Sequence, residues 1–95
     1  MSMGFARQLV TEDKFLGGQL VLMQPRDGYR AGVDPVFLAA SVAAHDGESV
    51  LDLGCGAGAA GLCLATRVAG IRLVGVERQA DYADLARKNS FDNDI

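Results

Sequence analysis

The segment 50–58, with the sequence VLDLGCGAG, constrains the fold more than any other part of the chain. It begins as an apolar run of the kind found in buried parallel strands. The run contains one carboxylate and is followed by glycines at alternate positions: Asp52, then Gly54, Gly56 and Gly58. Glycines allow a sharp turn and let a ligand approach without a Cβ in the way. Residues 59–69 are helix-forming, so the free N–H groups of that helix point at the loop. This order of elements is typical of a nucleotide-type cofactor site.

The glycines fit two registers, which belong to different cofactors. Gly56, Gly58 and Gly61 match the GxGxxG pattern of dinucleotide-binding proteins. The other register, Asp52-x-Gly54-x-Gly56-x-Gly58, keeps an acid two residues before the first glycine. A pyrophosphate gains nothing from a neighbouring carboxylate, whereas a cofactor with a cationic sulfonium and an ammonium group does. The acid therefore favours S-adenosylmethionine over NAD or FAD, and a tight turn without any ligand also fits the pattern.

A second acid follows the next apolar run. Residues 71–76 are rich in β-branched side chains, and Glu77 comes directly after them, 21 residues beyond Gly56. An acid at about this spacing hydrogen-bonds the ribose hydroxyls of a bound nucleoside. Because NAD and S-adenosylmethionine both contain adenosine, Glu77 does not separate them. It could also be a solvated acid that caps the following helix, and the two roles are compatible.

Composition excludes several classes of protein. About half of the 95 residues are apolar (49%) and 22% are charged, which is typical of a globular chain rather than a disordered one. The net charge of −3 argues against a nucleic-acid-binding surface formed by this chain alone. No apolar stretch approaches the roughly 18–20 residues of a membrane span, and no secretory signal is visible. We expect a reducing, cytoplasmic location.

The two cysteines do not indicate metal binding. Cys55 and Cys63 form neither a CxxC pair nor a zinc pattern, and His45 is the sole histidine. Cys55 is interpreted as a small filler whose backbone contacts a ligand, because no histidine base lies near it in sequence. Cys63 is interpreted as a buried helix residue.

The first half of the chain predicts a hairpin and a helix. Residues 19–24 are predicted as a strand that turns at 25–28 and pairs with residues 29–31, while the polar segment 11–14 is predicted as a turn. Asp34 before a proline predicts a helix N-cap, with the helix ending near Ala44.

The second half predicts a β-α-β-α unit. Its elements are a strand at 48–53, a helix at 59–69, a strand at 71–76 and a helix at 79–89 with an Asp84–Lys88 pair. We therefore predict an α/β fold in two parts. Residues 1–47 form the hairpin and helix, and residues 48–95 form an incomplete cofactor-binding domain.

With the glycine motif and the Val76-Glu77 step in place, the chain resembles class I S-adenosylmethionine-dependent methyltransferases. The segment 28–40, GYRAGVDPVFLAA, is similar to the part that precedes the first strand in bacterial proteins with a methyltransferase small domain. These proteins are similar to the tRNA adenine-N6 methyltransferases that modify a valine tRNA. The resemblance covers residues from about 15 to 95 and implies the N-terminal portion of a Rossmann-like fold.

The resemblance also implies residue roles. Asp52 and the three loop glycines would hold the methionine part of the cofactor, and Glu77 would take the ribose hydroxyls. Asp34 matches a family position near the amino-acid end of the cofactor, although a plain N-cap explains it equally well. The candidate cofactor-binding residues are Asp34, Asp52, Gly54, Cys55, Gly56, Gly58, Glu77 and Arg78. No catalytic or metal-binding residue is predicted.

The catalytic signature of the resembling amino-methyltransferases, Asn-Pro-Pro-Tyr, follows their fourth strand and does not occur in this sequence. We therefore expect the N-terminal part of a larger enzyme, truncated before the later strands and inactive by itself. An incomplete sheet leaves an edge and an apolar face uncovered, so self-association is expected.

The predicted function is the S-adenosylmethionine-binding part of a methyltransferase that acts on an amino group of an RNA base, namely adenine N6 of a tRNA. RNA is then the expected partner of the full-length enzyme. Two alternatives remain open. One is a non-catalytic half-domain that binds a nucleotide or another protein, and the other is a fragment of an NAD-dependent oxidoreductase.

Overall fold

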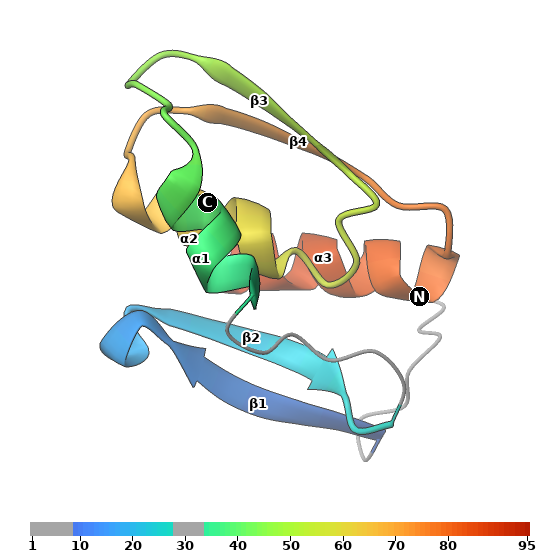
Figure 1. Cartoon of the computed structure of the whole chain (residues 1–95). Coiled ribbons are helices and arrows are strands. Elements are labelled where there is room, and N and C mark those ends of the chain that lie inside the picture. The colour runs from blue at the N-terminus through green and yellow to red at the C-terminus, as the bar shows by residue number, and fades with distance from the viewer. Residues whose placement is uncertain (1–8, 28–33) are drawn as a thin grey trace.

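A computed structural model describes residues 9–27 and 34–95 of the chain. Its elements are β1 (Val10–Phe15), the short 3-10 helix η2 (Leu16–Gly18), β2 (Leu20–Pro25), α1 (Asp34–Ser41), β3 (Ser49–Leu53), α2 (Ala59–Arg67), β4 (Arg72–Val76) and α3 (Ala80–Asp92). Figure 1 shows the helices lying between two small sheets, the β3–β4 pair on one side and the β1–β2 hairpin on the other. The predicted α/β order, a hairpin and a helix followed by a β-α-β-α unit, is confirmed.

The strands β3 and β4 pair directly and in parallel, and the crossover helix α2 connects them. Leu51 lies opposite Val74, and Leu53 lies opposite Val76. Because side chains alternate between the two faces of a sheet, Val50 and Leu73 point the other way and pack against the buried core. Because the two strands are parallel, their carboxyl ends meet at one edge of the sheet, where the glycine loop and Glu77 follow.

The hairpin has a different first strand from the predicted one. β2 pairs antiparallel with β1, so the predicted turn at 11–14 is wrong. β1 has only one neighbouring strand, and its exposed side chains alternate with half-buried ones. Because such an edge strand is partly open to solvent, residues 11–14 are polar although they form a strand. The chain reverses instead at Leu16, Gly17 and Gly18, which all have positive φ. The predicted return strand at 29–31 lies outside the described residues.

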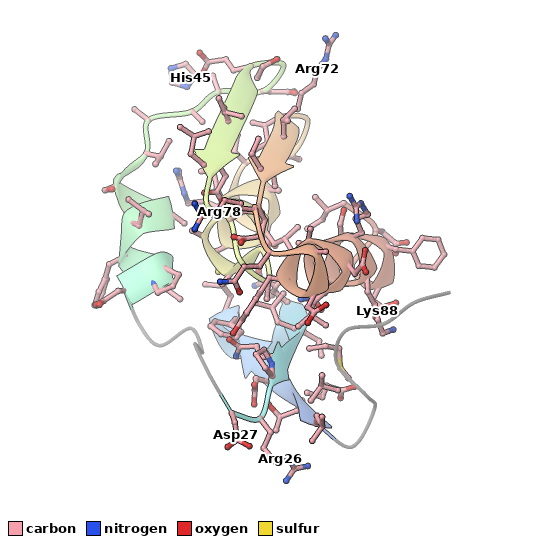
Figure 2. The ribbon with its side chains drawn as sticks, turned by 90° about the vertical axis from the view of Figure 1, so that its right-hand side faces the viewer. Arg26, Asp27, His45, Arg72, Arg78 and Lys88 are labelled. Atoms are coloured by element: carbon pink, nitrogen blue, oxygen red, sulfur yellow. The ribbon has the colours of Figure 1, made fainter. Side chains whose placement is uncertain are left out.

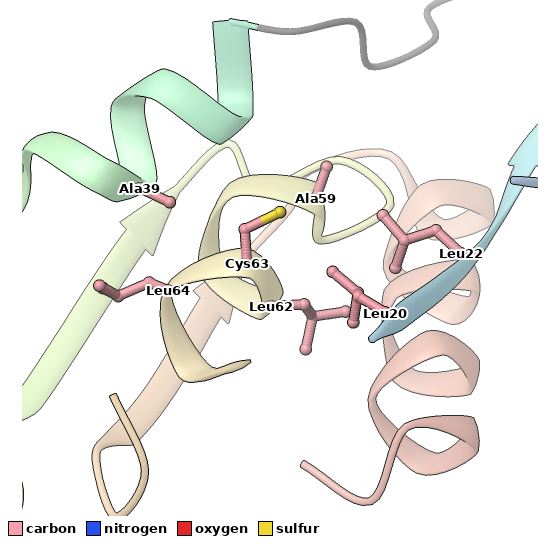
Figure 3. Packing of buried hydrophobic residues seen from close by; sticks show 7 residues of the cluster. All are labelled: Leu20, Leu22, Ala39, Ala59, Leu62, Cys63 and Leu64. Atoms are coloured by element: carbon pink, nitrogen blue, oxygen red, sulfur yellow. The ribbon is translucent and has the colours of Figure 1, made fainter. Parts of the chain in front are cut away.

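The buried core joins the hairpin to the helices (Figure 3). It consists of Leu20 and Leu22 from β2, Ala39 from α1, and Ala59, Leu62, Cys63 and Leu64 from α2. Cys63 is 2% exposed, which confirms its interpretation as a buried helix residue. The cluster takes side chains from both sides of residue 47, and the division into parts 1–47 and 48–95 stays a prediction.

Arg67 fixes the end of α1. Its guanidinium donates hydrogen bonds to the carbonyl oxygens of Ala39 (3.2 Å) and Val42 (2.5 Å). The last carbonyls of a helix have no partner within the helix, and Arg67 satisfies them where α1 ends at Ser41, before the predicted Ala44.

The last helix, α3, continues to Asp92 and is longer than predicted. Its extra turn changes the ion pairs. Lys88 pairs with Asp92 at 2.8 Å, and Asp84 pairs with Arg87 at 2.8 Å. The predicted Asp84–Lys88 pair is therefore wrong, because the longer helix offers Lys88 an acid on its C-terminal side.

Asn89 of α3 and Asn93, the residue that caps the C-terminus of α3, bind the free edge of β2. Asn89 accepts a hydrogen bond from the Met23 N–H (2.7 Å) and donates to the Met23 carbonyl (3.0 Å). Asn93 makes the same pair of bonds to Val21, at 2.9 and 2.7 Å. The side chain of Asn89 is fully buried and also donates to the carbonyl of Ala57 in the glycine loop (2.9 Å). The hairpin, α3 and the glycine loop are thus connected through one amide group.

The outer face of the β3–β4 pair is apolar and uncovered. Leu51, Leu53, Val74 and Val76 are 60%, 73%, 54% and 49% exposed. This uncovered face was predicted, and the self-association inferred from it stays a prediction. Among the described residues, no helix has the length and apolar character needed to cross a membrane.

Candidate functional site

The loop after β3 turns through left-handed backbone conformations that favour glycine. Gly54, Gly56 and Gly58 have φ values of +69°, +57° and +96°, a region that side chains with a Cβ rarely adopt. A Cβ added to Gly54 or Gly56 would meet no atom within 4 Å, so the space beside these two residues is open. Gly58 is the N-cap of α2.

The loop is held against the end of β4. The N–H groups of Gly54 and Cys55 both donate to the carbonyl of Val76, at 2.7 and 3.1 Å. The Gly58 N–H donates to the Cys55 carbonyl at 2.9 Å. These bonds fix the loop directly beside Glu77, the residue that follows β4.

The first acid, Asp52, lies beneath the start of α2. A Cβ on Gly61 would stand 2.9 Å from Leu73 and 3.2 Å from Oδ2 of Asp52, so only glycine lets the helix pack this closely on the sheet. The Gly61 N–H hydrogen-bonds the Asp52 carboxylate. Burial raises the pKa of Asp52, and this hydrogen bond partly opposes the rise.

The second acid, Glu77, joins the glycine loop to the start of α3. Its Oε1 accepts the Gly56 N–H and its Oε2 accepts the Gln79 N–H, both at 2.9 Å. The hydrogen bonds from Gln79 and then Gly56 lower the pKa of Glu77, and Arg78 contributes to the same shift. Glu77 is therefore a carboxylate at neutral pH. Arg78 itself is exposed and lies at the end of the parallel strands opposite Arg72 (Figure 2).

Cys55 fills space within the loop. A Cβ on Gly75 would lie 2.9 Å from its Sγ, so the thiol occupies the place that a side chain at Gly75 would take. Burial raises the pKa of the Cys55 thiol, and the nearby charges of Asp52 and Glu77 raise it further. A thiol that stays protonated is a poor nucleophile, and this agrees with a packing role.

Two cavities flank the loop. The first, of about 360 Å³, is lined by Gln24, Asp34, Pro35, Asp52, Gly54 and Cys55 together with neighbouring apolar residues. The second, of about 660 Å³, lies between β4 and α3 and is lined by Asp52, Cys55, Gly58 and Glu77 among others. The structure thus brings Asp34 and Asp52 to one cavity and Glu77 to the adjoining one. Gly56 and Arg78 line neither cavity.

Gln24 is a site residue that the sequence did not reveal. It is 2% exposed, lines the first cavity, and donates from Nε2 to Oδ2 of Asp13 at 2.9 Å. The available signal was a polar side chain at the end of an otherwise apolar strand. Among the described residues, no group of three His, Cys, Asp or Glu side chains is arranged to hold a metal.

The order of elements is that of a partial Rossmann-like methyltransferase fold. Residues 31–95 match the model of the methyltransferase small domain family, and the chain belongs to this family. It is also 41% identical over 61 residues to a cypemycin N-terminal methyltransferase from Streptomyces sp.. That match covers 61% of this chain and 24% of the relative, so the chain spans about a quarter of the curated protein that it resembles.

Proposed function

We propose that this chain forms the cofactor-binding part of an S-adenosylmethionine-dependent methyltransferase. The observation that carries the proposal is the pairing of Asp34 and Asp52 in one cavity against the glycine loop. S-adenosylmethionine supplies an electrophilic methyl group on a sulfonium. Its ammonium and sulfonium charges match the two carboxylates, and neither NAD nor FAD presents such charges together at its phosphates.

The adenosine end of the cofactor is assigned to Glu77. Each carboxylate oxygen can accept two hydrogen bonds, and each oxygen of Glu77 accepts one from the backbone. Lone pairs therefore remain for the ribose hydroxyls. Arg78 is retained as a candidate because it adjoins Glu77 at this edge of the sheet.

The acceptor is proposed to be an amine. The sequence resemblance favours the amino group of an RNA base, adenine N6 of a tRNA, while the name of the Streptomyces relative places its methylation at the N-terminus of cypemycin. The chain carries a net charge of −3 and so offers no evident electrostatic attraction to RNA phosphates. Contacts with RNA are thus assigned to other residues of a larger protein.

Cofactor binding is tested by calorimetric titration with S-adenosylmethionine, S-adenosylhomocysteine and NAD⁺. We expect both sulfur cofactors to bind and NAD⁺ to give no saturable heat. Asp52→Asn keeps an acceptor for the Gly61 N–H but removes the charge, and it should weaken S-adenosylmethionine by about tenfold. The exposed Asp27 provides a matched Asp→Asn control. Tighter binding of NAD⁺ than of either sulfur cofactor would overturn the assignment.

Methyl transfer is tested with tritiated S-adenosylmethionine and bulk tRNA. The 95-residue chain should give no turnover, because it carries no Asn-Pro-Pro-Tyr signature to position an acceptor amine, and orientation accounts for up to about 7–11 kcal/mol of a barrier. A longer protein, in which the later strands follow these residues, should methylate tRNA. Turnover by the short chain would contradict this account. If the longer protein methylates only a peptide N-terminus, the RNA acceptor is wrong.

Self-association through the outer sheet face is proposed as well. Sedimentation velocity should show dimers or larger species, and Leu53→Lys should shift them toward the monomer because Leu53 is 73% exposed on that face. A parent chain that remains monomeric at high concentration contradicts the proposal.

A further inference from the structure

A buried side chain that lines neither cavity, Asn89, joins two of the segments that form the wall of the first cavity. Its Nδ2 donates to the carbonyl of Ala57 at 2.9 Å, and Ala57 lines that cavity. The same carboxamide bonds both backbone groups of Met23, and the next residue in β2, Gln24, lines the cavity as well. One side chain thus fixes the glycine loop and the end of β2 relative to each other.

The peptide group between Ala57 and Gly58 is held at both ends. Its carbonyl oxygen accepts the hydrogen bond from Asn89, and its N–H, which belongs to Gly58, donates to the Cys55 carbonyl at 2.9 Å. Because a peptide group is planar, these two bonds together fix its rotation. Gly58 has a φ of +96° and is the N-cap of α2, so this peptide group sets how the chain passes from the loop into the helix.

Asn89 uses both the donor and the acceptor side of its carboxamide. A carboxamide offers two N–H donors and one carbonyl acceptor. Here Nδ2 donates to the carbonyls of Met23 and Ala57, and Oδ1 accepts the Met23 N–H. A carboxylate of the same shape could still accept the Met23 N–H, but it has no donor and would place an oxygen against two carbonyl oxygens.

Asn93 provides an internal comparison. It makes the equivalent pair of bonds to Val21, two residues before Met23 on the same edge of β2. The further hydrogen bond of its Nδ2 goes to the carbonyl of Asn89, not to the glycine loop. Both asparagines therefore hold the hairpin, whereas the hydrogen bond to the loop belongs to Asn89.

We propose that Asn89 is a positioning residue for the cofactor, because its carboxamide keeps the glycine loop and the end of β2 at the spacing that shapes the first cavity. This inference rests on the proposed function, which assigns the charged end of S-adenosylmethionine to that cavity. Asn89 acts through Ala57 and through the strand that carries Gln24. A loop that is ordered before the ligand arrives costs less free energy to order on binding, so Asn89 raises cofactor affinity without adding a charge.

The test compares Asn89→Asp with Asn93→Asp in the 95-residue chain. Each variant keeps an acceptor for its β2 N–H and loses its donors, but only Asn89→Asp loses a bond to the loop. Amide hydrogen exchange, followed by NMR, compares the Gly58 N–H with the slowest-exchanging amides of α2. Calorimetry measures the affinity for S-adenosylhomocysteine. If Asn89→Asp does not fold, the smaller pair Asn89→Ser and Asn93→Ser takes its place.

We expect the Gly58 amide to exchange at least about tenfold faster, relative to the slow amides of α2, in Asn89→Asp than in Asn93→Asp. S-adenosylhomocysteine should bind at least about tenfold more weakly to Asn89→Asp than to Asn93→Asp. A purely structural role would speed the exchange of Gly58 and of α2 in parallel and would leave the affinity of the folded chain unchanged.

The exchange measurement needs no ligand, so it separates this inference from the proposed function. Selective loosening of Gly58 in Asn89→Asp, in a chain whose parent does not bind S-adenosylhomocysteine, would support positioning of the loop and contradict the cofactor assignment. If the parent binds S-adenosylhomocysteine but the two variants bind it equally, the cofactor assignment stands and the positioning role is wrong. Equal exchange of Gly58 in the two variants would also contradict the positioning role.

Discussion

Gly56→Val is expected to abolish binding of S-adenosylhomocysteine, with a loss of about 100-fold or more, while the chain stays folded. The φ of Gly56 is +57°, and a Cβ there would meet no protein atom within 4 Å. A valine would thus project into the open space beside the loop, next to Glu77, to which the ribose of the proposed cofactor is assigned. The backbone strain of a β-branched residue in this region is about 1–3 kcal/mol, which is small enough for the fold to survive.

Gly47→Val separates backbone strain from obstruction of the ligand. Gly47 has a φ of +86°, and a Cβ there also meets nothing within 4 Å, but the residue precedes β3 at the end away from the loop. Both variants should lose similar stability in urea unfolding, and only Gly56→Val should lose the calorimetric signal. Unchanged cofactor affinity in Gly56→Val would show that the ligand does not approach this loop.

Asn89→Leu is expected to lower the free energy of unfolding by about 3–5 kcal/mol. The leucine is similar in size, but it leaves the N–H and C=O of Met23 and the carbonyl of Ala57 without their buried partner. Each buried polar group left unsatisfied costs about 1–3 kcal/mol. Because a small domain has about 5–15 kcal/mol in total, this single change should bring the chain close to unfolding.

Two other positions, one on α3 and one at its C-cap, calibrate the result. Asn93→Leu removes a similar pair of bonds from Val21 at a less buried site, so its effect should be smaller. Arg87→Ala removes an exposed ion pair with Asp84 and should change the stability by less than about 1 kcal/mol. If all three substitutions lower the free energy of unfolding equally, the hydrogen bonds of Asn89 stabilise the chain no more than an exposed ion pair does.

The β-α-β-α unit could be predicted from the sequence because its signals are local. The observed strands at 49–53 and 72–76 begin one residue after their predicted starts, and α2 begins at the predicted Ala59. β-branched runs, a glycine N-cap at Gly58 and glycines with positive φ each act within a few residues of themselves. The location of the two candidate acids could be predicted as well, because the carboxyl ends of parallel strands meet at one edge of a sheet.

The hairpin could not be predicted correctly, for an equally physical reason. β1 is an edge strand with charged side chains on its exposed positions, so residues 11–14 resemble a polar turn. The chain reverses direction after β1 at Leu16, which has a φ of +53°. A leucine rarely adopts this conformation, and no local sequence pattern indicates it. The pairing of β1 with β2 depends on packing of Leu20 and Leu22 against α2, which is a contact between distant segments.

The sequence by itself determined the family, the strand–loop–helix unit and the two acids that flank it, because these depend on residues close together in the chain. Only the tertiary structure decided which donors those acids occupy, and it alone revealed Gln24 in the first cavity and Asn89 beneath the loop. Asn89 and Met23 are 66 residues apart, and Glu77 and Gly56 are 21 apart. Such hydrogen bonds form only after separate elements have packed. The residues next to one partner in the sequence therefore do not indicate which residue it will bond to.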